Sequence, residues 1–164
     1  MLVIPGERSK YHGEMIDLLI YEDGNGGNVS VENGDIKTTG SLANQAYLAH
    51  FGGNVEANTT GDEQAGEIRE DWWGNSFLNN DKDSQMNSNL ERALNNNALS
   101  SQGRSEIEKQ AKNDLKYLSE MADITVSATI TGNDKIKISD KLDQVKNDFT
   151  WNATKDELIE EIII

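Results

Sequence analysis

The sequence predicts an α+β fold built on an antiparallel sheet, with a hairpin near each end and helices packed on the sheet between them. Three observations lead to this prediction. Asn33-Gly34 separates two short alternating runs, and this dipeptide favours a hairpin turn because both central positions need positive φ. Apolar residues then recur at helical spacing from Ile107 to Met121. The period changes to two from Ile124 to Ile130, and Gly132-Asn133-Asp134 leads into a second alternating run. This order of elements is typical of an α+β domain.

The first half of the domain is predicted to hold a strand, a hairpin and a helix. The strand runs from Met15 to Tyr21, and the hairpin pairs residues 28–32 with residues 35–39. Ser41 is expected to cap the helix, because its hydroxyl can accept a hydrogen bond from a free backbone amide. The helix should end at Phe51, where Gly52-Gly53 follows.

Two helices and three strands are predicted for the second half. A short helix covers residues 89–94, and a longer one begins at Ser105, where Ser105-Glu-Ile-Glu108 has the pattern of a capping box. Residues 123–139 should form a hairpin, extended by a strand near residues 149–153. The long helix should pack on this sheet through Ile107, Leu115, Leu118 and Met121, with Thr125, Ser127 and Thr129 on the opposite face of the sheet.

The length of 164 residues fits one domain with short tails. We expect an N-terminal arm at residues 1–14, a single α+β domain at 15–155 and a C-terminal tail at 156–164. The tail is acidic and then aliphatic, and its final isoleucines would be a poor choice for the surface of a monomer. We therefore expect a partner chain to cover the tail, through Leu158, Ile159, Ile162, Ile163 and Ile164.

The composition argues against several classes of function. Asp and Glu number 29 against 15 Lys and Arg, a net charge of −14, so a cationic surface for nucleic acid is not predicted. No apolar run approaches the roughly 20 residues that span a bilayer, so membrane insertion is not expected. The chain has no cysteine, and its two histidines, His12 and His50, occur in unrelated contexts. We predict neither a metal site nor a cofactor.

A long polar loop at residues 52–87 contains the tryptophan pair Trp72-Trp73, preceded by Arg69. One interpretation is a hydrophobic plug that holds the loop against its own domain. The other is an anchor for a neighbouring subunit, because Trp and Arg are enriched at interface hot spots. Both interpretations remain open from the sequence. We take Arg69, Trp72 and Trp73 as candidate partner-binding residues.

The sequence holds no recognisable catalytic constellation. It has no phosphate-binding glycine loop and no Gly-x-Ser-x-Gly elbow. A glycosidase would need two carboxylates across a cleft, and Glu56, Glu67, Glu70 and Asp71 lie in or near the loop. Carboxylates are frequent throughout the chain, however, so their presence discriminates nothing. A third option, an acidic mimic of DNA, is suggested by the net charge alone.

The order of these features resembles the baseplate proteins of Mu-like contractile phages, part of the wider sheath-initiator family, some of whose distant members are labelled lysozyme-like. The resemblance runs from about Met15 to Trp151, and Trp72-Trp73-Gly74 followed by Asn75 is its most specific part. Its other carriers are the strand at 16–20, the hairpin ending at Gly34-Asp35, the helices at 41–51, 89–94 and up to 121, and the strand at 124–130. The wider family often has a Glu-Pro-Arg motif after the first helix. Asn54-Val-Glu-Ala57 stands there instead, so those motif residues are not carried over.

The resemblance implies a structural component of a contractile tail baseplate, which joins wedge to tube and initiates sheath assembly by strand pairing. It implies no enzyme activity. Its partners would be a baseplate wedge protein, the sheath protein and a tube or hub protein, with several copies in each virion, assembled in the host cytoplasm. The alternative is a tail-associated peptidoglycan hydrolase that uses the loop carboxylates. Gene neighbours for a spike and a wedge protein would favour the first, and cell-wall activity lost on Glu-to-Gln changes would favour the second.

Overall fold

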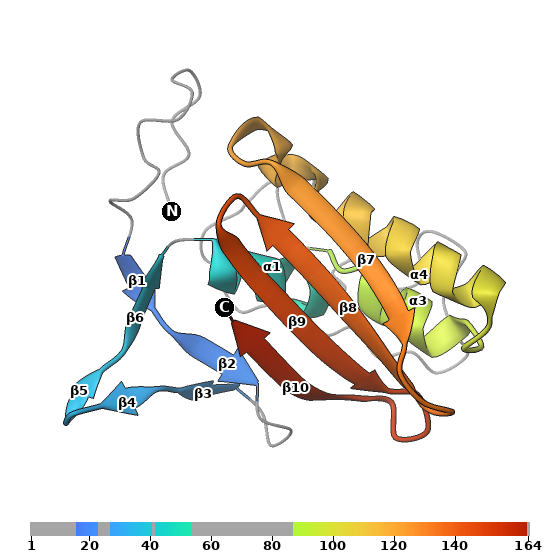
Figure 1. Ribbon diagram of the computed structural model, residues 1–164, viewed down its shortest axis with the longest axis horizontal. Helices are drawn as coiled ribbons and strands as arrows, with labels where there is room; N and C mark the ends of the chain where they lie inside the picture. The colour runs from blue at the N-terminus through green and yellow to red at the C-terminus, as the bar shows by residue number, and fades with distance from the viewer. Residues whose placement is uncertain (1–15, 23–26, 41, 54–86, 164) are drawn as a thin grey trace.

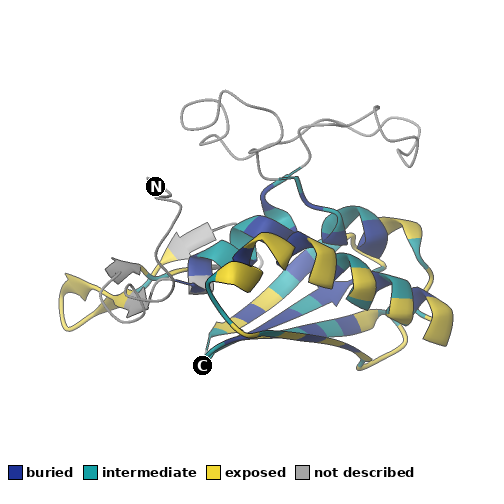
Figure 2. Cartoon of the chain, turned by 90° about the horizontal axis from the view of Figure 1, so that it is seen from above, coloured by how far each residue is buried: buried dark blue, intermediate teal, exposed yellow. Residues whose placement is uncertain are grey.

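The computed structural model describes residues 16–22, 27–40, 42–53 and 87–163, and it confirms the α+β class. These residues form two parts, a body of helices packed on a sheet and a set of short β-ribbons that projects from it (Figure 1). The helices cover one face of the sheet and leave the other face free of them (Figure 2).

Among the described residues, four antiparallel strands in the order β10-β9-β8-β7 make the sheet of the body. They are β7 (Ile124–Ile130), β8 (Lys135–Leu142), β9 (Val145–Asn152) and β10 (Glu157–Ile163). Each strand pairs with its neighbour in the sequence, so the sheet is a simple meander. The predicted hairpin at residues 123–139 is confirmed, and the strand predicted near 149–153 is the second half of β9.

The fourth strand corrects the expected C-terminal tail. Residues 157–163 pair with β9 from Glu157 opposite Asn152 to Ile163 opposite Asn147. The register shifts between Leu158 and Glu160, as at a β-bulge. Because a bulge inserts one residue, the alternation of apolar and polar side chains changes phase within the strand. The sequence therefore lacks the regular period of two by which a strand is predicted. The segment therefore belongs to the domain.

In the described residues, three α-helices and a 3₁₀ turn lie on one face of the sheet. They are α1 (Ala43–Phe51), α3 (Leu90–Asn96), α4 (Ser101–Asp114) and η2 (Lys116–Glu120). Helix α1 ends before Gly52-Gly53 as predicted, whereas Ser41, the expected cap, lies outside the described residues.

The predicted capping box at Ser105 is wrong, because α4 begins four residues earlier. Ser100 is the cap, and its Oγ accepts a hydrogen bond from the backbone amide of Gly103 (3.1 Å). The hydroxyl of Ser105 instead donates to the carbonyl oxygen of Ser101 within the helix. Gly103 allows this early start, since a Cβ there would meet the carbonyl oxygen of Ala98 at 2.0 Å.

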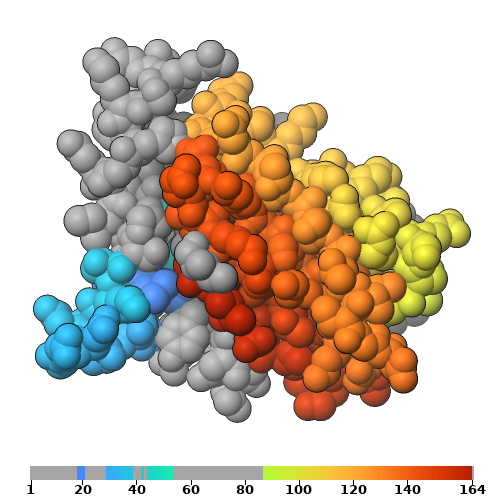
Figure 3. Space-filling view, in the orientation of Figure 1, coloured from blue at the N-terminus to red at the C-terminus, as the bar shows by residue number. Residues whose placement is uncertain are grey.

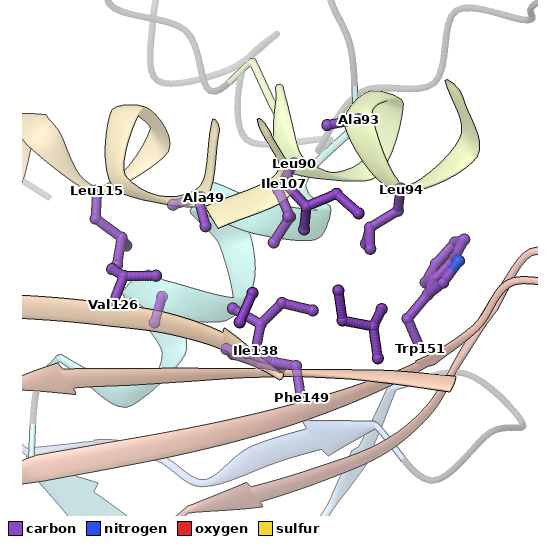
Figure 4. Packing of buried hydrophobic residues seen from close by; sticks show 14 of the residues in the cluster. Ala49, Leu90, Ala93, Leu94, Ile107, Leu115, Val126, Ile138, Phe149 and Trp151 are labelled. Carbon is purple, nitrogen blue, oxygen red and sulfur yellow. The ribbon is translucent and has the colours of Figure 1, made fainter. Parts of the chain in front are cut away.

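The core lies between the helices and the sheet, where the labelled side chains of both layers point toward one another (Figure 4). Ile107, Leu115 and Leu118 are fully buried, as predicted. On the other side of β7 the side chains of Thr125, Ser127 and Thr129 are exposed, which confirms the expected alternation. The aromatic part of the core comprises Phe51, Phe149 and Trp151, with Phe51 stacked on Trp151 at a centroid distance of 6.3 Å.

Six short strands form the projecting part, which we call the ribbon arm (described residues 16–22 and 27–40). They are β1 (Ile16–Leu18), β2 (Ile20–Glu22), β3 (Gly27–Val29), β4 (Val31–Glu32), β5 (Asp35–Ile36) and β6 (Thr38–Gly40). They pair as three two-stranded ribbons, β1 with β6, β2 with β3 and β4 with β5. The predicted turn at Asn33-Gly34 is confirmed by φ of 54° and 85°. The predicted hairpin around it is only two residue pairs long, because β3 and β6 pair elsewhere.

The three ribbons meet at a junction made of backbone hydrogen bonds. Leu19, Ser30 and Lys37 each link one ribbon to another, and each donates its amide to the carbonyl of the next in a closed ring. The N···O distances are 2.9 Å from Leu19 to Lys37, 2.8 Å from Lys37 to Ser30 and 3.3 Å from Ser30 to Leu19. These bonds satisfy backbone amides and carbonyls that would otherwise lack a hydrogen-bond partner where the strands change partner.

Candidate interaction surfaces

The ribbon arm carries the largest group of exposed apolar side chains in the described part of the chain. Val31 is 65% exposed and Ile36 is 48% exposed, and the two lie directly opposite each other on β4 and β5. Directly opposite residues share one face of an antiparallel ribbon. Glu32 and Asp35, the next pair, therefore occupy the other face. Further exposed apolar residues on the arm are Leu18, Ile20 and Val29. The tip of the arm is thus apolar on one face and acidic on the other.

A buried side chain fastens the arm to the body. Asn44 in α1 is 6% exposed, and its Nδ2 donates to the carbonyl oxygen of Leu18 at 2.7 Å. Its Oδ1 accepts from the backbone amide of Ile20 at 3.4 Å. The side-chain amide therefore substitutes for a neighbouring strand where β1 gives way to β2. This contact fixes the direction in which the arm leaves the body.

The outer face of the sheet, which faces the viewer in Figure 3, is rich in lysine. Lys135, Lys137 and Lys141 alternate along β8 with buried core residues, and Lys146 lies opposite Lys141 on β9. Across β7 the same face carries the hydroxyl side chains of Thr125, Ser127 and Thr129. We call this surface the lysine face.

Asp148 lies within the lysine face, 3.4 Å from the Nζ of Lys137 and 3.0 Å from that of Lys146. Burial raises the pKa of the Asp148 carboxyl, but hydrogen bonds from Ser139 and Lys146 and the charges of both lysines outweigh it and lower the pKa. Asp148 is therefore ionised at neutral pH and holds two of the four lysines in place.

The β7 edge of the sheet is closed by side chains of α4. Glu108 accepts a hydrogen bond from the backbone amide of Ala128, and Arg104 donates one to the carbonyl oxygen of the same residue, both at 3.2 Å. Arg104 and Glu108 also pair with each other. The hydrogen bond from Lys112 lowers the pKa of Glu108, with burial opposing, so that the carboxylate stays ionised. An incoming strand would have to displace this pair.

The opposite edge is β10, and no strand in the described part of the chain pairs with its outer side. Ile162 on this strand is 42% exposed. Leu158, expected to bind a partner, is instead buried in the core of its own domain, and Ile159 and Ile163 are half-buried. Ile162 is thus the predicted C-terminal contact that the structure leaves available.

The remaining predicted contacts, Arg69, Trp72, Trp73 and Ile164, lie outside the described residues. The same holds for the loop carboxylates of the hydrolase alternative, Glu56, Glu67, Glu70 and Asp71.

A buried polar cluster joins the helices to the sheet. The Nε2 of His50 in α1 lies 2.6 Å from Asp140 on β8, and its Nδ1 lies 3.6 Å from Asp114 at the end of α4. Burial lowers the pKa of His50, but the charges and hydrogen bonds of Asp140 and Asp114 outweigh it and raise the pKa to about 9. His50 is therefore an imidazolium between two carboxylates at neutral pH.

The same cluster holds the start of α3. Asp114 accepts hydrogen bonds from the backbone amides of Asn89 (3.0 Å) and Leu90 (2.8 Å), which have no partner within the helix. The hydroxyl of Ser88 donates to the carbonyl oxygen of His50. The His50 and Asp140 side chains are fully buried, so the cluster offers no surface to a substrate and its role is structural.

Two surfaces were missed by reasoning from sequence. The apolar face of the arm had one local signal, the valines and isoleucine that alternate on either side of Asn33-Gly34. The lysine face also had a signal, since Lys135, Lys137 and Lys141 alternate with Ile136 and Ile138. His50 had none, because its partners lie far away in the sequence.

The described residues hold no group of three or more His, Asp or Glu placed to bind a metal ion. Within the same residues, no helix has the length and apolar character needed to cross a bilayer. Comparison of the chain with protein-family models, curated proteins and solved structures found no match.

Proposed function

We propose that the chain is a structural component of a contractile phage tail baseplate, which joins the wedge to the tube and initiates the sheath by strand pairing. The proposal combines the sequence resemblance with the two kinds of contact surface that the fold presents. Its partners would be a wedge protein, the sheath protein and a tube or hub protein. In this role the chain acts by holding other subunits, not by catalysis.

One observation carries the proposal, the ribbon arm that places Val31 and Ile36 in solvent (Figure 2). Apolar side chains on a projecting ribbon contribute nothing to the core of this domain. Exposed apolar patches of this kind mark protein contacts. The two hydrogen bonds of Asn44 add to this argument. They fix the direction of the arm, and a fixed direction favours binding of a partner at its exposed face.

The two sheet edges indicate where strand pairing would occur. The β7 edge is occupied at Ala128 by Arg104 and Glu108, whereas the β10 edge is unpaired among the described residues. Addition of a strand to an open edge binds through backbone hydrogen bonds and tolerates many partner sequences. We therefore assign the pairing with a sheath subunit to β10, beside Ile162.

The proposal is tested by assembly of tail particles from the gene products encoded beside this chain. Omission of the chain should give tail tubes without sheath in electron micrographs. Ile162→Lys should reduce sheath assembly, because lysine on an edge strand opposes pairing. Thr129→Lys is the matched control, since it places lysine at an exposed position on β7, the strand at the closed edge, and should leave sheath assembly unchanged. Normal sheathed tails without the chain would overturn the proposal.

A further inference from the structure

We propose that β2 of the ribbon arm covers the β10 edge in the unassembled chain and must move away before a partner strand pairs there. The inference rests on the proposed function and deepens it, because it names what regulates strand pairing at β10. In the unassembled chain the arm is thus an autoinhibitory cover as well as a contact surface.

The position that a partner strand would take is already occupied. Strand β2 lies beside β10 and approaches it from the side away from β9 (Figure 1). A strand added to a sheet lies about 4.8 Å from its neighbour, so a partner strand cannot share the stretch of the edge that β2 reaches. In the described part of the chain β2 pairs with β3 and forms no ladder with β10. The edge is therefore covered while its own backbone groups stay available for a partner.

A cover of this kind protects the unassembled chain. An open edge strand is a template for pairing with another chain, and proteins commonly place another part of the chain over such an edge. The β7 edge has a cover bonded to its backbone, the side chains of Arg104 and Glu108 at Ala128. The β10 edge has a removable one, because among the described residues β2 forms no backbone ladder with it.

Asn44 holds β2 in this position. Its side chain is 6% exposed, and it hydrogen-bonds the carbonyl oxygen of Leu18 at 2.7 Å and the amide of Ile20 at 3.4 Å, where β1 gives way to β2. The outer part of the arm adds little to this attachment, since every residue from 31 to 38 is exposed. Displacement of the arm therefore breaks few buried contacts, which is typical of a segment that opens locally.

The arrangement sets an order of contacts during assembly. Val31 and Ile36 are exposed while β2 covers the edge, so the tip of the arm can meet a partner first. A partner that draws the tip away from the body breaks the two Asn44 bonds and frees β10 for strand pairing. Contact at the arm and pairing at the edge are thereby coupled.

The position of the arm can be measured with spin labels, because the chain has no cysteine of its own. Nitroxide labels on Glu32→Cys in the arm and Ser127→Cys on β7, both exposed positions, report the distance between arm and body by electron paramagnetic resonance. We expect one narrow distance distribution in the chain with wild-type Asn44. Asn44→Leu is close to asparagine in shape but forms no side-chain hydrogen bond, and it should broaden the distribution. Asn44→Ala should do the same, because it removes the same bonds without filling the space.

The state of the edge is measured by sedimentation velocity of the unlabelled full chain over a range of concentrations. Asn44→Leu should self-associate about tenfold or more tightly than the wild type. Tenfold corresponds to about 1.4 kcal/mol, the order of magnitude expected for the loss of two hydrogen bonds. Addition of Ile162→Lys to this variant should reverse the association, because lysine on an edge strand opposes pairing.

Asn97→Leu is the matched control. It makes the same substitution at a side chain that donates a hydrogen bond to the carbonyl oxygen of Ala93 (2.8 Å), but in the helical layer. It should change neither the distance distribution nor the association. Circular dichroism checks that each variant is folded.

Three results would overturn the inference. They are a narrow distance distribution that both Asn44 variants retain, a broadened distribution without increased self-association, and self-association that Ile162→Lys does not reverse. The proposed function is judged separately. Normal sheathed tails without the chain would reject the baseplate role and leave these measurements standing, whereas an arm that stays in place in a chain required for the sheath would reject only the cover.

Discussion

The buried imidazolium of His50 should make the stability of this domain depend on pH in the alkaline range. Its pKa is raised from the ordinary value of 6.5 to about 9, chiefly by Asp140, against the opposing effect of burial. The folded state therefore binds a proton on His50 that the unfolded state has already released above pH 6.5. This stabilisation is fully present below pH 6.5 and is lost as pH rises through 9.

The size of the effect follows from the shift. A rise from 6.5 to about 9 corresponds to roughly 3 kcal/mol, because one pKa unit is worth about 1.4 kcal/mol. Domains of this size typically have free energies of unfolding of about 5–15 kcal/mol, so the loss should be large. In thermal unfolding it corresponds to a fall in Tm of roughly 6–12 °C, at about 2–4 °C per kcal/mol.

Urea unfolding followed by circular dichroism between pH 6 and pH 10 measures this dependence. Asp140→Asn is the key variant, because it keeps the shape of the side chain and removes the carboxylate whose charge raises the pKa of His50 most. It should lower the free energy of unfolding by about 3–5 kcal/mol at pH 6, since breaking a buried ion pair leaves a charge without its partner. Its profile between pH 6.5 and 9 should be much flatter than that of the wild type.

The second histidine provides the control. His12 lies outside the described residues, and the His12→Gln variant measures whatever it contributes over the same range. A wild-type free energy of unfolding that stays constant from pH 6 to pH 10 would refute the assignment of an imidazolium to His50. An alkaline loss that disappears in His12→Gln would refute it equally.

Three further predictions concern the core, the β7 edge and the tryptophan pair. Phe149→Ala should lower the free energy of unfolding by about 3–5 kcal/mol, because the ring is fully buried, and a loss below about 1 kcal/mol in urea unfolding would contradict its central place. Glu108→Ala should leave the domain folded but free the amide of Ala128, so thioflavin fluorescence should reveal strand-mediated aggregation that the wild type lacks. Trp72→Ala or Trp73→Ala should cost roughly 2–4 kcal/mol of folding or binding free energy, and normal folding and assembly of both variants would reject the anchor hypothesis.

The parts of the fold that the sequence predicted are those with a strong local period. The apolar spacing from Ile107 to Leu118 identified α4 and the face that it buries together with η2, although α4 itself ends at Asp114 and does not reach Met121 as predicted. The alternation in β7 and β8 likewise identified a hairpin and its exposed side. In a helix, side chains three or four positions apart share one face, and in a strand those two positions apart do so. Such short spacings are visible in the sequence itself.

The parts that the sequence did not predict depend on distant or backbone contacts. The junction of the ribbon arm uses the backbone amides and carbonyls of Leu19, Ser30 and Lys37, which leave no trace in side-chain pattern. The bulge in β10 moved its apolar residues out of phase. The cluster around His50 brings together positions 50, 114 and 140, and a single sequence gives no sign that these three side chains meet.

The two edges of the sheet, taken together with the arm, favour assembly in one direction. Arg104 and Glu108 form hydrogen bonds with the carbonyl oxygen and the amide of Ala128 and so close the β7 edge. Without these two side chains, the same backbone groups could pair with an incoming strand. Among the described residues no strand pairs with the outer side of β10, although β2 of the arm lies beside this strand (Figure 1). A chain with two open edges would polymerise by edge pairing with itself. A chain with one closed edge can accept a strand at the other and must use a different surface to meet its neighbours. The apolar face of the arm, with Val31 and Ile36, offers such a surface, which is why we assign strand pairing to β10 and a second contact with a neighbouring subunit to the arm.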